Sequence, residues 1–269
     1  MTRRLAAGLV GALALGIASG ALAQIRPLND SGQIVCYNDT ASTGTVSSGT
    51  PDPESAGFNE QDCTRGRAAA DTVGALRKLG ASSAPGRDYT KIANNGSELP
   101  ASALLGSGVS DWGCTRDNLS GLIWEVKTDD NGLRDKDHSY TWYDSNSGVN
   151  GGNTGSLGSN TTCSSSLINC NITAFRDAVN ALAGSSRLCG QTDWRLPTAM
   201  DLQSLAYNVS SSPTIDASYF PNTLPGIYWS GVNYAADAAD ALVVSFNVGS
   251  LGPFSKPGIG QVRLVRGGP

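Results

Sequence analysis

The stretch Asp193-Trp194-Arg195-Leu196-Pro197-Thr198 joins a short extended run to the start of a helix. Pro197 biases Leu196 away from helical angles, so the extended run ends there. Thr198 is a favourable N-cap residue, and Asp201 three positions later gives a weak form of the capping box. The stretch therefore predicts a strand-to-helix corner, followed by a helix over residues 199–207.

Periodicity outside this corner predicts the remaining elements. Apolar spacing indicates a clear helix over residues 173–183 and a shorter one over residues 65–79. Period-two alternation indicates a hairpin with strands at residues 112–116 and 122–127. Further strands are expected at residues 34–37, 88–93, 227–231, 241–247 and 261–266. Helices embedded among short antiparallel strands predict an α+β domain over residues 88–269, preceded by a partly irregular arm at residues 24–87.

Residues 1–23 have the features of a secretory signal peptide. Arg3 and Arg4 precede an apolar run that ends in Ala21-Leu22-Ala23, an A-x-A cleavage site. The mature chain is then expected to begin at Gln24 and to be secreted, periplasmic or held at the cell surface. A membrane anchor is the alternative for this run, and no later stretch is long and apolar enough for membrane insertion.

The charge of the chain argues against two classes of partner. Without Arg3 and Arg4, 17 of the 19 basic residues remain against 23 acidic residues, a net charge of about −6. Because an acidic protein repels phosphate backbones and anionic headgroups, we expect neither nucleic acid nor anionic lipid as the main partner.

Six cysteines follow the signal region, and an even number in an exported protein predicts three disulfides. Six cysteines allow fifteen pairings. We expect Cys36–Cys63 to staple the arm, Cys163–Cys170 to clip a loop and Cys114–Cys189 to join two core segments. A metal site is the alternative for these cysteines, but the chain has no C-x-x-C motif and His138 is its only histidine.

The loop after residue 127 carries the most concentrated charge. Its carboxylates could supply oxygen ligands for calcium, although their spacing does not fit an EF-hand loop. The simpler interpretation is a solvated acidic loop. The residues concerned are Asp129, Asp130, Asp135 and Asp137. His138 would have to serve any Ser–His–Asp site, and the chain has no G-x-S-x-G elbow, so hydrolase chemistry is disfavoured.

Five motifs, in order, resemble those of the Lcl C-terminal domain family. They are Asp117–Trp124 (DNLSGLIW), Tyr140–Tyr143 (YTWY), Asp193–Thr198 (DWRLPT), Tyr228–Ser230 (YWS) and Val262–Arg266 (VRLVR). The resemblance implies a secreted or surface domain with a fold related to C-type lectins and to formylglycine-generating sulfatase modifiers. It also implies that the late strands and loops form the ligand face.

The chain departs from that resemblance in two ways that bear on its ligand. The family's namesake is an adhesin for sulfated glycans, whereas this chain is acidic, which puts binding of sulfated polyanions in doubt. The Glu-Pro-Asn and Trp-Asn-Asp calcium triplets of sugar-binding C-type lectins are also missing from the sequence, so calcium-dependent sugar binding is not implied.

Taken together, these features predict a non-catalytic binding or adhesion module that recognises a glycan or a protein, without a cofactor. Rigid aromatic and amide side chains would form its ligand face, because aromatics give contact area at a low entropic cost. The candidate contacts are Tyr140, Trp142, Tyr143, Tyr228, Asn233, Tyr234, Asp237, Asn247 and Lys256. An enzyme related to the sulfatase modifiers and a structural envelope protein are the alternatives, and homo-oligomers are compatible with all three.

Two further sets of residues are expected to be structural. Trp124, Trp194 and Trp229 should lie in the core, since buried tryptophans usually satisfy one polar group. Arg195, Arg263 and Arg266 should pair with Asp193, Asp201 or backbone carbonyls.

Overall fold

The computed structural model describes residues 29–30, 32–33, 35–38, 42–45 and 61–267. The expected signal peptide and the expected start at Gln24 lie outside these residues. No helix within the described residues is long and apolar enough to cross a membrane.

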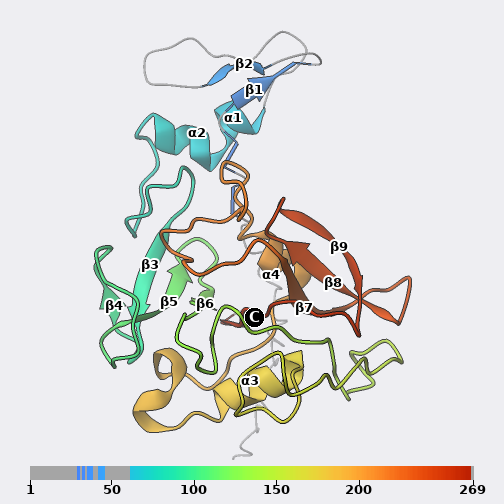
Figure 1. Cartoon of the computed structure of the whole chain (residues 1–269). Coiled ribbons are helices and arrows are strands. Elements are labelled where there is room, and N and C mark those ends of the chain that lie inside the picture. The colour runs from blue at the N-terminus through green and yellow to red at the C-terminus, as the bar shows by residue number, and fades with distance from the viewer. Residues whose placement is uncertain (1–28, 31, 34, 39–41, 46–60, 268–269) are drawn as a thin grey trace, which may run out of the picture.

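A five-stranded antiparallel sheet forms one side of the main body, in the order β10-β6-β5-β3-β4 (Figure 1). Its strands are β3 (Tyr89–Ala93), β4 (Glu98–Leu99), β5 (Trp112–Asp117), β6 (Ile123–Glu125) and β10 (Val265–Arg266). The predicted hairpin is confirmed as β5 and β6, with Arg116 opposite Ile123. Asp117 fixes its turn by accepting hydrogen bonds from Leu119 N and Ser120 Oγ.

A three-stranded antiparallel sheet forms the other side, in the order β7-β8-β9. Its strands are β7 (Ile227–Asn233), β8 (Asp240–Ser245) and β9 (Ser250–Ser255). The strand predicted at residues 261–266 is reduced to β10. Strand β9 was not predicted, because Gly252 and Pro253 interrupt the composition typical of a strand.

Two of the predicted helices are present but shorter than expected. Helix α3 (Ile172–Asn180) begins at Asn171, whose side chain accepts from Ala174 N. Helix α4 (Ala199–Gln203) begins at Thr198 with a complete capping box through Asp201. It ends early because the chain then turns, and Tyr207 N bonds to Thr214 O in place of a helical partner.

The helix predicted over residues 65–79 is instead two short helices. They are α1 (Asp62–Arg65) and α2 (Arg67–Thr72), separated by Gly66 in an extended conformation. Gly74 then takes a φ of 73°, which glycine adopts without strain, and the helix does not continue. These helices and the hairpin β1 (Val35–Tyr37) with β2 (Ser42–Thr45) form the arm at one end of the molecule (Figure 1).

The three predicted disulfides are confirmed. Their Cα–Cα distances are 5.3 Å for Cys36–Cys63, 6.3 Å for Cys114–Cys189 and 5.6 Å for Cys163–Cys170. Cys114–Cys189 ties β5 to the segment before the corner, so it joins two core regions. The α+β class with disulfide staples is thereby confirmed.

The corner at residues 193–198 is a structural junction. Arg195 exchanges backbone hydrogen bonds with Val265, which adds one rung beyond β10. The Arg195 guanidinium lies 2.8 Å from Asp201, and Arg266 pairs with Asp193 at 2.8 Å. Arg263 donates to Glu125 O and Thr223 Oγ1. The structural roles expected for these arginines are therefore confirmed.

The three tryptophans expected in the core are buried, as predicted. Trp124 and Trp229 are fully buried and Trp194 is 2% exposed. Trp194 Nε1 donates to Leu188 O, and Trp229 Nε1 donates to Tyr140 O. These bonds connect the corner to the segment of Leu188, and β7 to the segment of Tyr140.

Candidate ligand-binding site

The acidic loop at residues 128–137 follows β6 and is held by one buried carboxylate. Asp135 accepts backbone hydrogen bonds from Asp130 N, Asn131 N and Asp137 N at 2.6–2.9 Å. Burial alone would raise the pKa of Asp135, but these three N–H groups outweigh it and keep the pKa below its ordinary value. The loop is therefore preorganised, because an ionised side chain satisfies its backbone donors.

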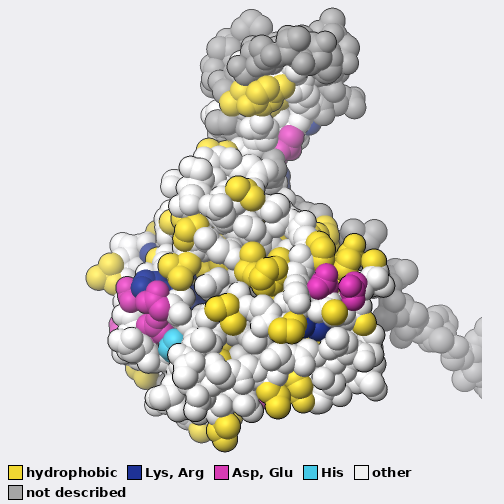
Figure 2. Space-filling model, turned by 45° about the vertical axis from the view of Figure 1, so that its right-hand side comes forward, with side chains coloured by type: hydrophobic (Ala, Val, Ile, Leu, Met, Phe, Trp, Pro, Cys, Tyr) yellow, Lys and Arg dark blue, Asp and Glu magenta, His cyan; other side chains and the backbone are white. Residues whose placement is uncertain are grey.

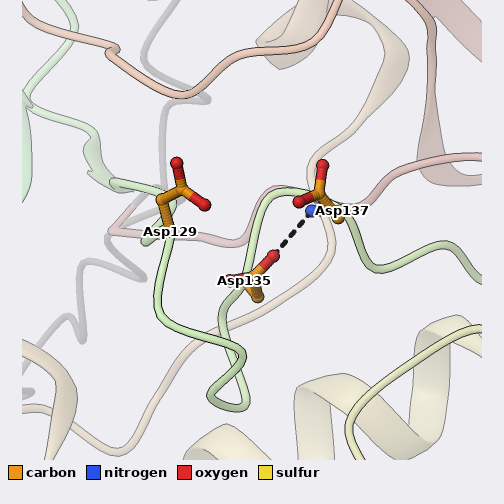
Figure 3. Close-up of side chains that lie close together, drawn as sticks. All are labelled: Asp129, Asp135 and Asp137. Carbon is orange, nitrogen blue, oxygen red and sulfur yellow. Dashed lines mark hydrogen bonds between the residues drawn. The ribbon is translucent and has the colours of Figure 1, made fainter.

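Carboxylate oxygens of Asp129, Asp135 and Asp137 lie within 4.8 Å of one another (Figure 3). A cationic side chain is already among them, since Lys136 Nζ lies 3.1 Å from Asp129 and 2.8 Å from Asp137. Hydrogen bonds to Asp137 and Asp129 raise the pKa of Lys136 above its ordinary value. A calcium ion at this cluster would have to compete with that ammonium group.

Asp130, the fourth predicted calcium ligand, has a different role from the other three. Its carboxylate accepts from Thr128 Oγ1 at 2.8 Å and Gly132 N at 2.9 Å, which closes the start of the loop. His138 is half-buried at the end of the same loop. Figure 2 shows acidic side chains gathered beside a basic group and the histidine on this face.

A cleft of about 270 Å³ opens beside this loop, and we call it the acidic cleft. Its polar wall consists of Ser107, Thr128, Asp129, Asp130 and Asn222. These residues come from three separate segments of the chain: the loop before β5, the acidic loop, and the segment before β7. The cleft therefore exists only in the folded chain.

Amide hydrogen bonds hold the two outer walls of the acidic cleft. Asn94 Nδ2 donates to Gly106 O at 2.9 Å and to Gly108 O at 3.0 Å, which fixes the loop that carries Ser107. Asn222 has a φ of 58° and donates to Lys127 O at 3.1 Å. A positive φ at asparagine is uncommon and is tolerated where local hydrogen bonds secure it.

The backbone of Lys127 thus supports the cleft, while its side chain lies in the protein interior. Lys127 Nζ is 2.9 Å from Glu125 Oε1 and 4.3 Å from the centre of the Phe175 ring. Burial lowers the pKa of Lys127 to about 8, although Glu125 opposes that shift. Both side chains are almost completely buried, so a ligand in the cleft cannot reach them.

The chemistry available in the acidic cleft is hydrogen bonding. Ionised carboxylates accept hydrogen bonds, the hydroxyls of Ser107 and Thr128 both donate and accept, and the Asn222 amide offers both functions. A ligand with several hydroxyl groups can satisfy this mixture.

Four of the predicted ligand contacts are wrong, because Tyr140, Trp142, Tyr228 and Lys256 are at most 1% exposed. Their polar groups are directed inward: Trp142 Nε1 donates to Ser230 O, and Tyr228 Oη accepts from Leu224 N. Lys256 Nζ donates to Asn150 O and Asn153 O and lies over the Trp142 ring. An aromatic rung that looks suitable for a ligand therefore belongs to the core.

The other five predicted contacts are accessible but do not form one surface. Asn233, Tyr234 and Asp237 lie together before β8, where Asn233 Nδ2 bonds to Tyr234 O. Tyr143 is half-exposed and bridges to Gly155. Asn247 follows β8 at its opposite end, and a six-residue strand separates the two ends by roughly 20 Å.

Besides Thr128 of the acidic loop, two polar residues of the acidic cleft, Ser107 and Asn222, were not predicted from the sequence. Ser107 lies between Gly106 and Gly108, a composition that indicates a loop and gives no sign of a ligand. Asn222 follows Pro221 in a segment without periodicity. Only the fold brings them to Asp129 and Asp130, which were predicted as ion ligands rather than as a cleft wall.

The family comparison agrees with the motifs in the sequence. The model of the Lcl C-terminal domain family matches residues 113–266, which is more than half of the chain and includes all five motifs. The comparison with curated proteins found no match.

Proposed function

The chain belongs to the Lcl C-terminal domain family, and we propose that it is a non-catalytic binding or adhesion module whose acidic cleft recognises a glycan. The observation that carries this proposal is the polar wall of the cleft, built from two carboxylates, two hydroxyls and one amide. Such groups pair with the neighbouring hydroxyls of a sugar ring, which offer donors and acceptors together.

The size of the cleft favours a short segment of glycan. Its volume of about 270 Å³ is just below the usual range of roughly 300–1,000 Å³ for small-molecule sites. The walls are preorganised by Asp135, Asn94 and the Asn222 amide, so little ordering is needed when a ligand binds. These properties suit repeated, weak recognition of one or two sugar units.

The disulfides support a location outside the cytoplasm, because such bonds persist in oxidising compartments. Together with the predicted signal peptide they favour a secreted, periplasmic or surface protein. They also leave no free thiol within the described residues. An oxidase that needs a reactive cysteine pair is therefore the weaker alternative.

The experiment that tests this proposal is a glycan array followed by titration calorimetry on the best glycan. The variant Asp129→Asn removes a charged acceptor from the wall of the acidic cleft. We expect its Kd to rise by at least about tenfold, since hydrogen bonds to charged groups are worth roughly 1.5–3 kcal/mol. A chelator should leave binding unchanged, because Lys136 Nζ already pairs with Asp129 and Asp137 in the aspartate cluster.

Asp237→Asn is the matched control, because Asp237 is an exposed acidic residue on the loop before β8. It changes the net charge as Asp129→Asn does but leaves the acidic cleft intact. Weaker binding by Asp237→Asn and not by the cleft variant would move the site to the loop of Asn233 and Tyr234. Absence of glycan binding by the wild-type protein would overturn the proposal.

A further inference from the structure

A second cleft, of about 190 Å³, adjoins the acidic cleft, and we call it the basic cleft. Ser107 lines both clefts, so they meet at that residue. The other polar residues of the basic cleft are Asn94, Arg134, Ser185, Ser186 and Arg187. Carboxylates therefore line the acidic cleft, guanidinium groups line the basic cleft, and Ser107 belongs to both.

Arg134 is held at the wall of the basic cleft by the backbone. Its Nη1 donates to Val126 O at 2.9 Å and to Gly113 O at 3.5 Å. Among the described residues its Nε and Nη2 make no hydrogen bond. Burial lowers the pKa of Arg134 despite the nearby charges of Glu125 and Asp130, so the protein's own carboxylates do not fully offset its desolvation.

Arg187 faces the same cleft and is exposed. Its side chain has no hydrogen bond or ion pair within the part of the chain that the structure describes, unlike Arg116, Arg176, Arg195 and Arg266. Ser185 and Ser186 are also exposed beside it. Two guanidinium groups with unused donors, flanked by hydroxyls, form a site for an oxyanion.

The local charge limits how much negative charge that ligand can carry. The acidic loop holds four aspartates against Arg134 and Lys136, and Arg187 adds one further positive charge. The neighbourhood is thus slightly negative as a whole, which opposes a highly charged anion. A single carboxylate matches the planar fork of a guanidinium and adds only one negative charge.

We propose that the basic cleft binds the carboxylate of an acidic sugar residue, so that the glycan of the proposed function is a uronate-containing one. This inference rests on the proposed function, because the neighbouring sugar hydroxyls would occupy the acidic cleft. The volume of the basic cleft corresponds to roughly six water molecules at about 30 Å³ each, which leaves room for part of the ring that carries the carboxylate.

The test is an NMR titration of the ¹⁵N-labelled protein with sodium glucuronate and, separately, with its neutral methyl ester. We expect saturable shifts at the amides of Ser185–Leu188 with glucuronate, and at least about tenfold weaker binding of the ester. Arg187→Gln should weaken glucuronate binding by about tenfold or more, because it removes a charge-assisted hydrogen bond. The affinity of Arg187→Lys for glucuronate should fall between those of the wild type and Arg187→Gln, since lysine keeps the charge but lacks the planar fork of the guanidinium.

Arg77→Gln is the control, since Arg77 is an exposed arginine on the arm and its loss changes the net charge equally. Glucuronate binding equal to that of its ester, or equally weakened by Arg77→Gln, would overturn the inference. So would complete displacement by an equal concentration of sodium sulfate.

The two proposals can fail separately. If neutral glycans bind through Asp129 while glucuronate has no advantage over its ester, the proposed function stands and this inference fails. If Arg187 determines glucuronate binding while Asp129→Asn has no effect, the anion site stands and the acidic cleft fails.

Discussion

Three lysines are buried with their ammonium groups over aromatic rings. Lys91 lies 3.9 Å from the ring centre of Trp112, and Lys256 lies 4.2 Å from that of Trp142. Each of these two also donates to carbonyl oxygens of a long loop, Lys91 to Ala103 and Lys256 to Asn150 and Asn153. The lysines therefore fix loops that have few apolar side chains with which to pack.

Lys127 differs from the other two because its partner is a carboxylate. Replacing it by methionine leaves Glu125 buried without its ion-pair partner, which should cost about 3–5 kcal/mol of unfolding free energy at pH 7. Glu125→Gln added to Lys127→Met should recover much of that loss, because the buried carboxylate that Lys127 paired with is then absent. Urea unfolding of the three proteins, with disulfides intact, measures both effects.

The stability contributed by Lys127 should also depend on pH. Its pKa is about 8 in the folded chain, below the ordinary lysine value of 10.5, so the folded state loses its proton first as the pH rises. Between pH 8 and 10.5 the unfolded chain binds more protons, and stability relative to Lys127→Met should rise across this window. Below pH 8 the difference in unfolding free energy between the wild type and Lys127→Met should not change with pH. A difference that falls between pH 8 and 10 would contradict the lowered pKa.

Elements defined by local signals were predicted from the sequence. The hairpin of β5 and β6 follows from alternation and a turn closed by Asp117, and α4 begins where Thr198 and Asp201 form the capping box. The alternation also put Glu125 and Lys127 on the face opposite Trp124. In the structure this second face is also covered, and Phe175 of α3 lies over Lys127. The sequence could not predict this, because the covering helix lies about 50 residues away in the chain.

Strand β9 shows why one element gave no sequence signal. Lys256 N, just after β9, donates to Ala239 O, just before β8. In an antiparallel pair only alternate residues bond to the neighbouring strand, so Phe254 and Gly252 face β8 and the nitrogen of Pro253 points away from β8. The missing N–H of proline therefore costs no hydrogen bond in the sheet, and it interrupts the free edge against further pairing. A proline that argues against a central strand is compatible with an edge strand, and the sequence does not show which strand lies at the edge.

The loop after Tyr143 offers a matched test of backbone contact. Gly152 and Gly155 both have a positive φ, 88° and 79° respectively. They differ in their surroundings: a Cβ on Gly155 would lie 2.1 Å from Trp142 O, whereas a Cβ on Gly152 would have no atom within 4 Å. Gly152→Ala should cost about 1–2 kcal/mol, the penalty for a left-handed residue. Gly155→Ala should cost a further 1–3 kcal/mol or so, because the loop must move off the buried Trp142.

Chemical denaturation of the two glycine variants separates the cost of the left-handed backbone from the cost of the contact with Trp142. Equal destabilisation would show that the loop relaxes freely and that its contact with Trp142 carries no energy. A fluorescence change confined to Gly155→Ala would support displacement at Trp142.

At the scale of the whole molecule, the clefts depend on long-range contacts that periodicity cannot predict. The acidic and basic clefts draw residues from Asn94, Ser107, the acidic loop, Ser185–Arg187 and Asn222. Asp129 and Asp130 were recognisable by their charge, whereas the hydroxyls and amides resemble those of any loop. Three of the predicted aromatic contacts were wrong for a related reason: Tyr140, Trp142 and Tyr228 are buried in the core, and charged loops face solvent.

The disulfides let the contribution of such a long-range contact be measured. Cys114–Cys189 closes 75 residues and joins β5 to the segment before the corner, whereas Cys163–Cys170 closes only 7. If a disulfide stabilises by restricting the unfolded chain, replacing Cys114 and Cys189 by serine should cost about 4.5 kcal/mol, and replacing Cys163 and Cys170 about 2.4 kcal/mol. Removing the Cys114–Cys189 bridge would also release the wall of the basic cleft, because Cys189 follows Arg187 and Leu188 directly. Urea unfolding of the two double variants gives the comparison, and equal losses would mean that local strain or residual structure, and not loop length, determines what each bridge contributes.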